Sequence, residues 1–128
     1  MISHVAIWVS DLEKMRSFYA KYFGGIPNDL YHNPAKDFYS YFLSFKSGPT
    51  LELMQMPAVN ECRSNPDKEY IGLAHLCFGV GSKEKVDGLT KQLVGDGYTL
   101  LSGPKVTGDG HYESCIYDPE LNRVEITV

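Results

Sequence analysis

The chain has 128 residues, of which 43% are hydrophobic and 22% charged, the size and balance of one compact globular domain. The net charge of −4, with 12 Lys and Arg against 16 Asp and Glu and no basic cluster, argues against nucleic acid and membrane surfaces as partners. The sequence contains no run of 18 apolar residues, and its start lacks the pattern of a secretion signal. We therefore expect a cytoplasmic protein that acts on small molecules.

The first half of the chain predicts a strand, a helix and further strands. From His4 to Val9 the β-branched residues Val5, Ile7 and Val9 alternate with other residues, a pattern that predicts a strand. A capping box beginning at Ser10 predicts the start of a helix, and Gly24 marks its end. Strands are then predicted at Phe38–Phe45 and at about Leu51–Met56.

The second half repeats this order after a linker at residues 57–71, which is rich in Pro, Asn and charged residues. A strand around His75 is followed by a helix that Ser82 caps and that Gly95 or Gly97 ends. The side chains expected to face the core from this helix are Val86, Leu89, Leu93 and Val94. Further strands are predicted at Tyr98–Leu101, Tyr112–Tyr117 and Arg123–Val128.

The two halves align as an internal repeat. A shift of 71 places (75 − 4) brings His4 onto His75, and a shift of 73 (125 − 52) brings Glu52 onto Glu125, so one loop differs by two residues. We predict an α+β protein of two tandem βαβββ modules, residues 1–56 and 72–128, which share one domain. Their mixed sheets would curl around a pocket.

The four repeat-related residues are candidate metal ligands. His4, Glu52, His75 and Glu125 each lie in an otherwise apolar run, where burial is costly unless the group is paired or bound to a metal. A structural histidine or glutamate is the alternative at each position. Two imidazoles and two carboxylates suit one divalent metal with open positions, and ligand type alone does not choose among nickel, zinc, manganese and iron.

Strand alternation predicts which residues accompany these ligands. Side chains two apart share a face, so Trp8 accompanies His4, while Met54 and Met56 accompany Glu52. Cys77 shares a face with His75 in the same way. We predict that these side chains line a substrate pocket. With no CxxC spacing and an odd number in all, the cysteines Cys62, Cys77 and Cys115 are expected to be reduced thiols.

Several segments, taken in order, are similar to those of a known family. They are His4-Val5-Ala6-Ile7, Val9-Ser10-Asp11-Leu12-Glu13-Lys14, Phe18-Tyr19-Ala20-Lys21-Tyr22-Phe23-Gly24-Gly25, Leu51-Glu52-Leu53, Ala74-His75-Leu76, Ser102-Gly103-Pro104, and the run from Tyr117 to Ile126. In their order and spacing the chain resembles the vicinal oxygen chelate superfamily, which comprises glyoxalases, bleomycin resistance proteins and extradiol dioxygenases. The resemblance covers essentially all 128 residues.

The His, Glu, His, Glu order resembles bacterial glyoxalase I type lyases more closely than extradiol dioxygenases, which use two His and one Glu. This resemblance implies a lactoylglutathione lyase-like enzyme that moves a proton next to a carbonyl through a metal-chelated ene-diolate. It implies Glu125 as the base, with Glu52 as the alternative. We expect a homodimer because each half exposes an open sheet face, and the resemblance implies that each metal takes its ligand pairs from different chains. An epimerase or dioxygenase on the same scaffold, or a small-molecule binding protein of the drug-resistance kind, are the alternatives.

Three positions depart from the bacterial glyoxalase I pattern. Trp8 stands where that pattern has a basic residue, and Met56 where it has an asparagine. Both changes remove groups that would hold glutathione, so we expect glutathione to be a poor co-substrate. Leu121 stands where the turn usually carries glycine, which affects loop shape more than chemistry.

Overall fold

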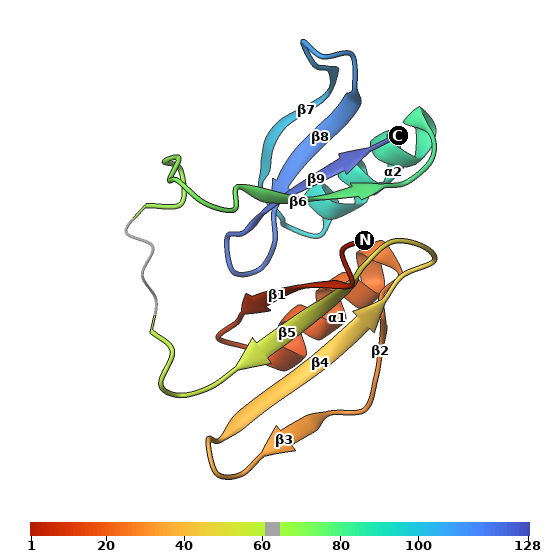
Figure 1. Ribbon diagram of the computed structural model, residues 1–128. Coiled ribbons are helices and arrows are strands. Elements are labelled where there is room, and N and C mark those ends of the chain that lie inside the picture. Colours follow the sequence, from red (N-terminus) through yellow and green to blue (C-terminus); the bar gives the residue numbers. More distant parts are fainter. Residues whose placement is uncertain (61–64) are drawn as a thin grey trace. The chain divides into compact units, whose positions relative to one another are not determined.

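The computed structural model describes residues 1–60 and 65–128, so Cys62 and the part of the predicted linker at 61–64 lie outside the described residues. The chain divides into two compact units, Met1–Arg63 and Ser64–Val128 (Figure 1). None of the helices within the described ranges is long and apolar enough to cross a membrane.

Unit 1 contains β1 (His4–Trp8), α1 (Leu12–Phe23), β2 (Ile26–Pro27), β3 (Tyr31–Asn33), β4 (Phe38–Ser44) and β5 (Thr50–Gln55). The sheet order is β1-β5-β4-β2, with β3 also paired to β4. β1 runs parallel to β5, and the other pairs are antiparallel. The sequence did not predict β2 and β3, because strands of two and three residues are too short to show an alternating pattern.

Unit 2 contains β6 (His75–Gly79), α2 (Lys83–Gly95), β7 (Leu100–Val106), β8 (Tyr112–Tyr117) and β9 (Arg123–Thr127), in the sheet order β6-β9-β8-β7. The predicted strand Tyr98–Leu101 is shifted, since β7 continues through Gly103 and Pro104. Gly103 has φ +79°, and a Cβ there would collide with the carbonyl oxygen of Glu113. Only glycine accommodates that approach of β7 to β8.

The repeat predicted from the sequence is present in the structure. α1 and α2 begin 71 residues apart (83 − 12), whereas β5 and β9 begin 73 apart (123 − 50). In each unit the residue after the first strand donates a backbone hydrogen bond of 2.8 Å to the last strand, from Val9 to Met54 and from Val80 to Thr127. The prediction of an α+β fold with two repeated modules is confirmed.

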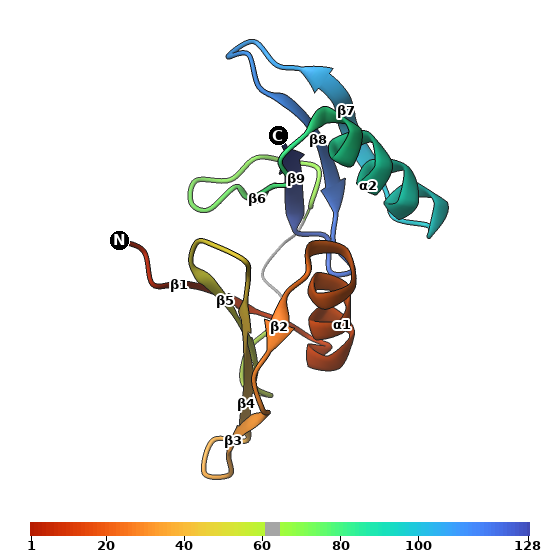
Figure 2. The same cartoon turned by 90° about the vertical axis from the view of Figure 1, so that its right-hand side faces the viewer.

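Each helix covers one face of its own sheet, as Figure 2 shows from the side. The aliphatic residues Leu51, Leu53, Val124 and Ile126 are buried on the face that each helix covers, and the opposite sheet face carries the candidate ligands. In unit 1 the core includes Met15, Phe18, Tyr19, Leu43, Leu51 and Leu53; in unit 2 it includes Val86, Leu93, Ile116, Val124 and Ile126.

Two predictions about the helices were wrong. The N-cap of α1 is Asp11 and not Ser10: the Asp11 carboxylate accepts a hydrogen bond from the Lys14 amide at 3.0 Å. Val94 is 46% exposed, because it lies about 80° around the axis of α2 from buried Val86. The Ser82 cap was predicted correctly.

Candidate functional site

Unit 1 brings His4 and Glu52 together on the open face of its sheet. Glu52 pairs with Ala6 across β1 and β5, so His4 is its diagonal neighbour on the same face. His4 Nε2 lies 3.8 Å from Glu52 Oε2, and the side chains are 45% and 14% exposed. The ring of Phe42, which lies opposite Glu52 on β4, meets the His4 ring edge-on at 5.5 Å.

Unit 2 brings His75 and Glu125 together in the equivalent place. His75 Nε2 lies 3.0 Å from Glu125 Oε2, and the side chains are 40% and 21% exposed. Glu125 is flanked across the sheet by Cys77 on β6 and Cys115 on β8. Both units therefore present one imidazole and one carboxylate that face each other and are accessible to solvent.

The 3.0 Å separation in unit 2 suits two ligands of a common metal, whereas the 3.8 Å separation in unit 1 would have to shorten on metal binding. Two donors bound at about 2.1 Å and at right angles to each other are about 3.0 Å apart, and tetrahedral angles give slightly more. Within residues 1–60 and 65–128, no three His, Cys, Asp or Glu side chains form a group that could hold a metal ion. Each unit supplies two candidate ligands, and the convergence of all four on one metal stays a prediction.

The sulfur atoms beside Glu125 belong to thiols that resist ionisation. Burial, followed by the charges of Glu125 and Glu113, raises the pKa of the Cys77 thiol to about 11. Burial and Glu125 likewise raise the pKa of Cys115 to about 11. Neither cysteine forms a disulfide. Both are neutral thiols at physiological pH, and neutral thiols are poor nucleophiles.

Two predicted pocket residues of unit 1, Trp8 and Met54, lie on the face that carries His4 and Glu52. Trp8 pairs with Met54 across β1 and β5 and is 45% exposed. Met56 follows the end of β5 and is half-buried. The sequence interpretation missed Phe38, whose ring lies 6.0 Å from that of Trp8. Strand alternation alone places Phe38 on the same face as Phe42. To place that face beside Glu52, however, the register between β4 and β5 must also be known.

The equivalent face of unit 2 is polar. Arg123 lies opposite both His75 on β6 and Tyr117 on β8, and it forms an ion pair with Glu69. The Tyr117 hydroxyl donates to Asp67 Oδ1 at 2.8 Å. Residues from the end of the predicted linker are therefore bonded to the sheet beside the His75–Glu125 pair.

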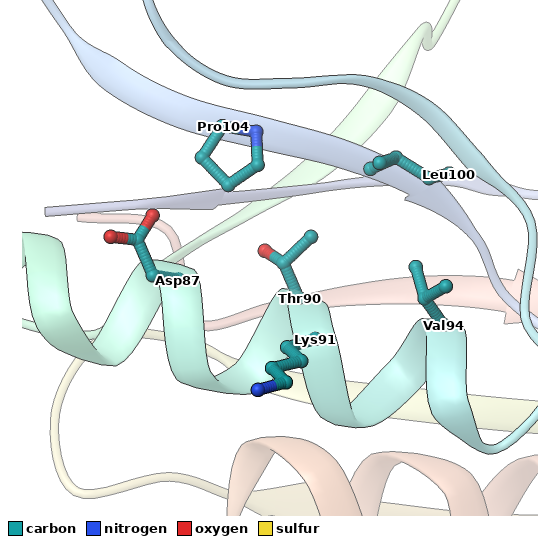
Figure 3. Close-up of a pocket in the computed structure, with 6 residues that line it drawn as sticks. All are labelled: Asp87, Thr90, Lys91, Val94, Leu100 and Pro104. Atoms are coloured by element: carbon teal, nitrogen blue, oxygen red, sulfur yellow. The ribbon is translucent and has the colours of Figure 1, made fainter.

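A shallow hollow of about 300 Å³ lies elsewhere on unit 2, between α2 and β7 (Figure 3). The hollow lies on the helix side of the sheet, because Thr90 in its wall hydrogen-bonds to Ser114 on β8. The next residue, Cys115, points to the opposite face, which is the face that carries His75 and Glu125. The hollow holds no pair of catalytic groups, and we do not assign the site to it. Its lining residues are Asp87, Thr90, Lys91, Val94, Leu100 and Pro104.

Comparisons with known proteins agree with this architecture. The profile of the family described as Glyoxalase/Bleomycin resistance protein/Dioxygenase superfamily matches residues 1–126. The uncharacterized protein YqjT of Bacillus subtilis (strain 168) is 33% identical over an alignment of 133 positions, gaps included, which covers 96% of this chain and 94% of that protein. The solved structure of a glyoxalase family protein from Enterococcus faecalis superposes with a TM-score of 0.78 at 26% identity, covering 100% of this chain and 97% of the other. The trypanothione-dependent glyoxalase I of Leishmania major superposes with a TM-score of 0.76 at 20% identity over 99% of this chain and 85% of the other, a likeness of fold.

Proposed function

Because the chain belongs to the glyoxalase, bleomycin resistance protein and dioxygenase superfamily, we propose that it is a metal-dependent lyase or isomerase of the glyoxalase I type. In this proposal His4, Glu52, His75 and Glu125 hold one divalent metal. The observation that carries it is the pairing of one His with one Glu at repeat-equivalent positions on both open sheet faces. A structural role would not require the same two residue types to meet twice.

The metal would act as a Lewis acid that stabilises negative charge on two neighbouring substrate oxygens. The residues of the chain supply the proton transfer. A carboxylate oxygen of Glu125 takes the proton from the carbon next to the carbonyl and returns it to the neighbouring carbon, with Glu52 as the alternative base. Both carboxylates are partly buried, which limits competition from water at the oxygen that receives the proton.

We further propose that the chain forms a homodimer, with the two ligand pairs at each metal contributed by different chains. Each unit leaves one sheet face without a covering helix, and that face carries ionisable groups whose chemistry requires exclusion of water. Sedimentation of the protein at micromolar concentration tests this point, and a protein found only as monomer would contradict it.

The proposed reaction is tested by exchange of hydrogen next to the carbonyl. Methylglyoxal is offered in D2O with a panel of thiols, and deuterium in the product is followed by NMR. We expect exchange that a chelator stops and added divalent metal restores. Replacement of Glu125 by Gln should slow exchange by about 10²–10⁴, the usual contribution of a general base. Metal-loaded protein that exchanges no hydrogen on any adduct, or that consumes oxygen instead, would contradict a lyase or isomerase.

A further inference from the structure

The open face of unit 1 carries a connected set of large apolar side chains. Trp8, Met54, Ser40 and Tyr31 follow one another in register across β1, β5, β4 and β3. The ring of Phe38 lies 6.0 Å from that of Trp8 at 89°, and 6.1 Å from that of Tyr31 at 63°. These are favourable edge-to-face geometries. We call Trp8, Tyr31, Phe38 and Met54 the aromatic layer.

The outer surface of the aromatic layer is open. Ser40, in the middle of the row, is only 3% exposed, whereas Trp8 and Tyr31 are 45% and 52% exposed. The large side chains thus cover the sheet and present their own surface outward. Single exposed apolar residues are common, but a connected apolar patch is typical of a binding surface.

The aromatic layer begins next to a proposed metal ligand. Met54 and Glu52 are two residues apart on β5 and point to the same face, so their rows are separated by about 6.6 Å. A substituent attached directly to a small group bound at Glu52 would reach that row. The layer is therefore continuous with the proposed site.

The repeat shows that the fold does not demand this layer. Trp8 aligns with Gly79 and Met54 with Thr127 in unit 2, where the equivalent strands pair in the same register. If large apolar groups were needed to stabilise this face of the module, unit 2 would carry them too. Their restriction to unit 1 indicates a role in recognition.

We infer that the aromatic layer binds a planar, uncharged group of the substrate. Its side chains carry no charge, and three of them offer ring surfaces, which suit another ring and not a charged peptide. This inference rests on the proposed function and specifies it: the substrate is an aryl-substituted carbonyl compound whose two neighbouring oxygens reach the metal.

The test compares two chelators with the same pair of oxygens, benzohydroxamate and acetohydroxamate, on zinc-loaded protein. Zinc binding and then chelator binding are measured by calorimetry, and ring contact is followed by fluorescence, because Trp8 is the single tryptophan of the chain. We expect the wild type to prefer the phenyl compound at least about tenfold, as aromatic contacts of this kind provide. Trp8→Ala and Phe38→Leu should each reduce that preference to less than about threefold, whereas the control Val94→Ala should keep it.

The outcomes separate this inference from the proposed function. If zinc binds and both chelators bind equally well, the aromatic layer does not recognise the substrate, and the proposed metal site is unaffected. If zinc does not bind, the proposed function fails and takes the inference with it. If Trp8→Ala leaves the phenyl preference unchanged but dissociates a dimer in sedimentation, the layer is a subunit contact and the inference is overturned.

Discussion

Replacing Trp8 by arginine would restore the basic residue of the bacterial glyoxalase I pattern. Trp8 is exposed on the open face of unit 1 and lies opposite Met54, one row from Glu52. An arginine there would extend over the same face without entering the core. Its guanidinium could then bind a carboxylate of glutathione in the bidentate manner that arginine favours.

The expected gain follows from the strength of one charged hydrogen bond. Such a bond contributes about 1.5–3 kcal/mol, or about one to two powers of ten in affinity. We expect wild-type protein to turn over the methylglyoxal and glutathione adduct weakly, and Trp8→Arg to raise kcat/KM by about 10- to 100-fold. Adding Met56→Asn should raise kcat/KM further, since a side-chain amide that can hydrogen-bond to glutathione replaces a thioether.

The assay is the formation of thioester from methylglyoxal and glutathione by metal-loaded protein. Trp8→Leu is the matched control, because it removes the indole ring without adding charge. Robust turnover by the wild type, equal to that of Trp8→Arg, would refute the reasoning that these two positions decide against glutathione. A gain in Trp8→Leu as large as in Trp8→Arg would show that loss of the ring, and not the new charge, is the cause.

Three further predictions concern stability. Thr90→Val should lower the free energy of unfolding by about 1–3 kcal/mol in chemical denaturation, because the buried Ser114 Oγ would lose its hydrogen-bond partner, Thr90 Oγ1, at 2.6 Å. An unchanged free energy of unfolding, or an equal loss in Thr90→Ser, would contradict this prediction. The Tyr41 hydroxyl, 2.7 Å from the Glu13 carboxylate, is the main cause of the lowered pKa of Glu13, so Tyr41→Phe should raise that pKa toward 4.5 in an NMR titration. Folding favours the ionised form of Glu13, so Tyr41→Phe should destabilise the protein above pH 4.5. This destabilisation should disappear as the pH falls through the folded-state pKa of Glu13. A destabilisation that persists in acid would contradict the prediction. Leu121 has φ +64° and is 47% exposed, so Leu121→Gly should stabilise the protein to thermal unfolding by roughly 0.5–1 kcal/mol, and destabilisation would show that contacts of the leucine outweigh its backbone strain.

The features that the sequence predicted well are local or repeated. The alternation around His4 and His75 identifies strands, and strand parity separates the ligand face from the helix face without knowledge of the pairing. The offset of 71 that grows to 73 predicted which elements correspond and that the two halves differ in length by two residues. Leu121, which stands where the family pattern has a turn glycine, has a positive φ, in keeping with the expected effect on loop shape.

The features that the sequence did not predict depend on tertiary contacts. Asp11 and Ser10 are both good helix caps, and the choice of Asp11 depends on where β1 ends and where Gln55 accepts a hydrogen bond from the Leu12 amide. The aromatic layer needs the register of β3 on β4, and β3 has only three residues. No pattern within one segment reveals that Tyr31 and Trp8 share a surface.

Metal stoichiometry tests the central claim most directly. Calorimetric titration of metal-free protein with zinc should give one ion per chain. His4→Ala and His75→Ala should each weaken zinc binding by more than about 100-fold. Replacing a residue that only hydrogen-bonds a metal ligand costs up to about 100-fold in metal affinity, and losing the ligand itself costs more. The control His111→Ala should bind zinc as the wild type does. Two ions per chain, or weakening in the variant of one unit only, would show that the two His–Glu pairs do not share a metal and would contradict the account.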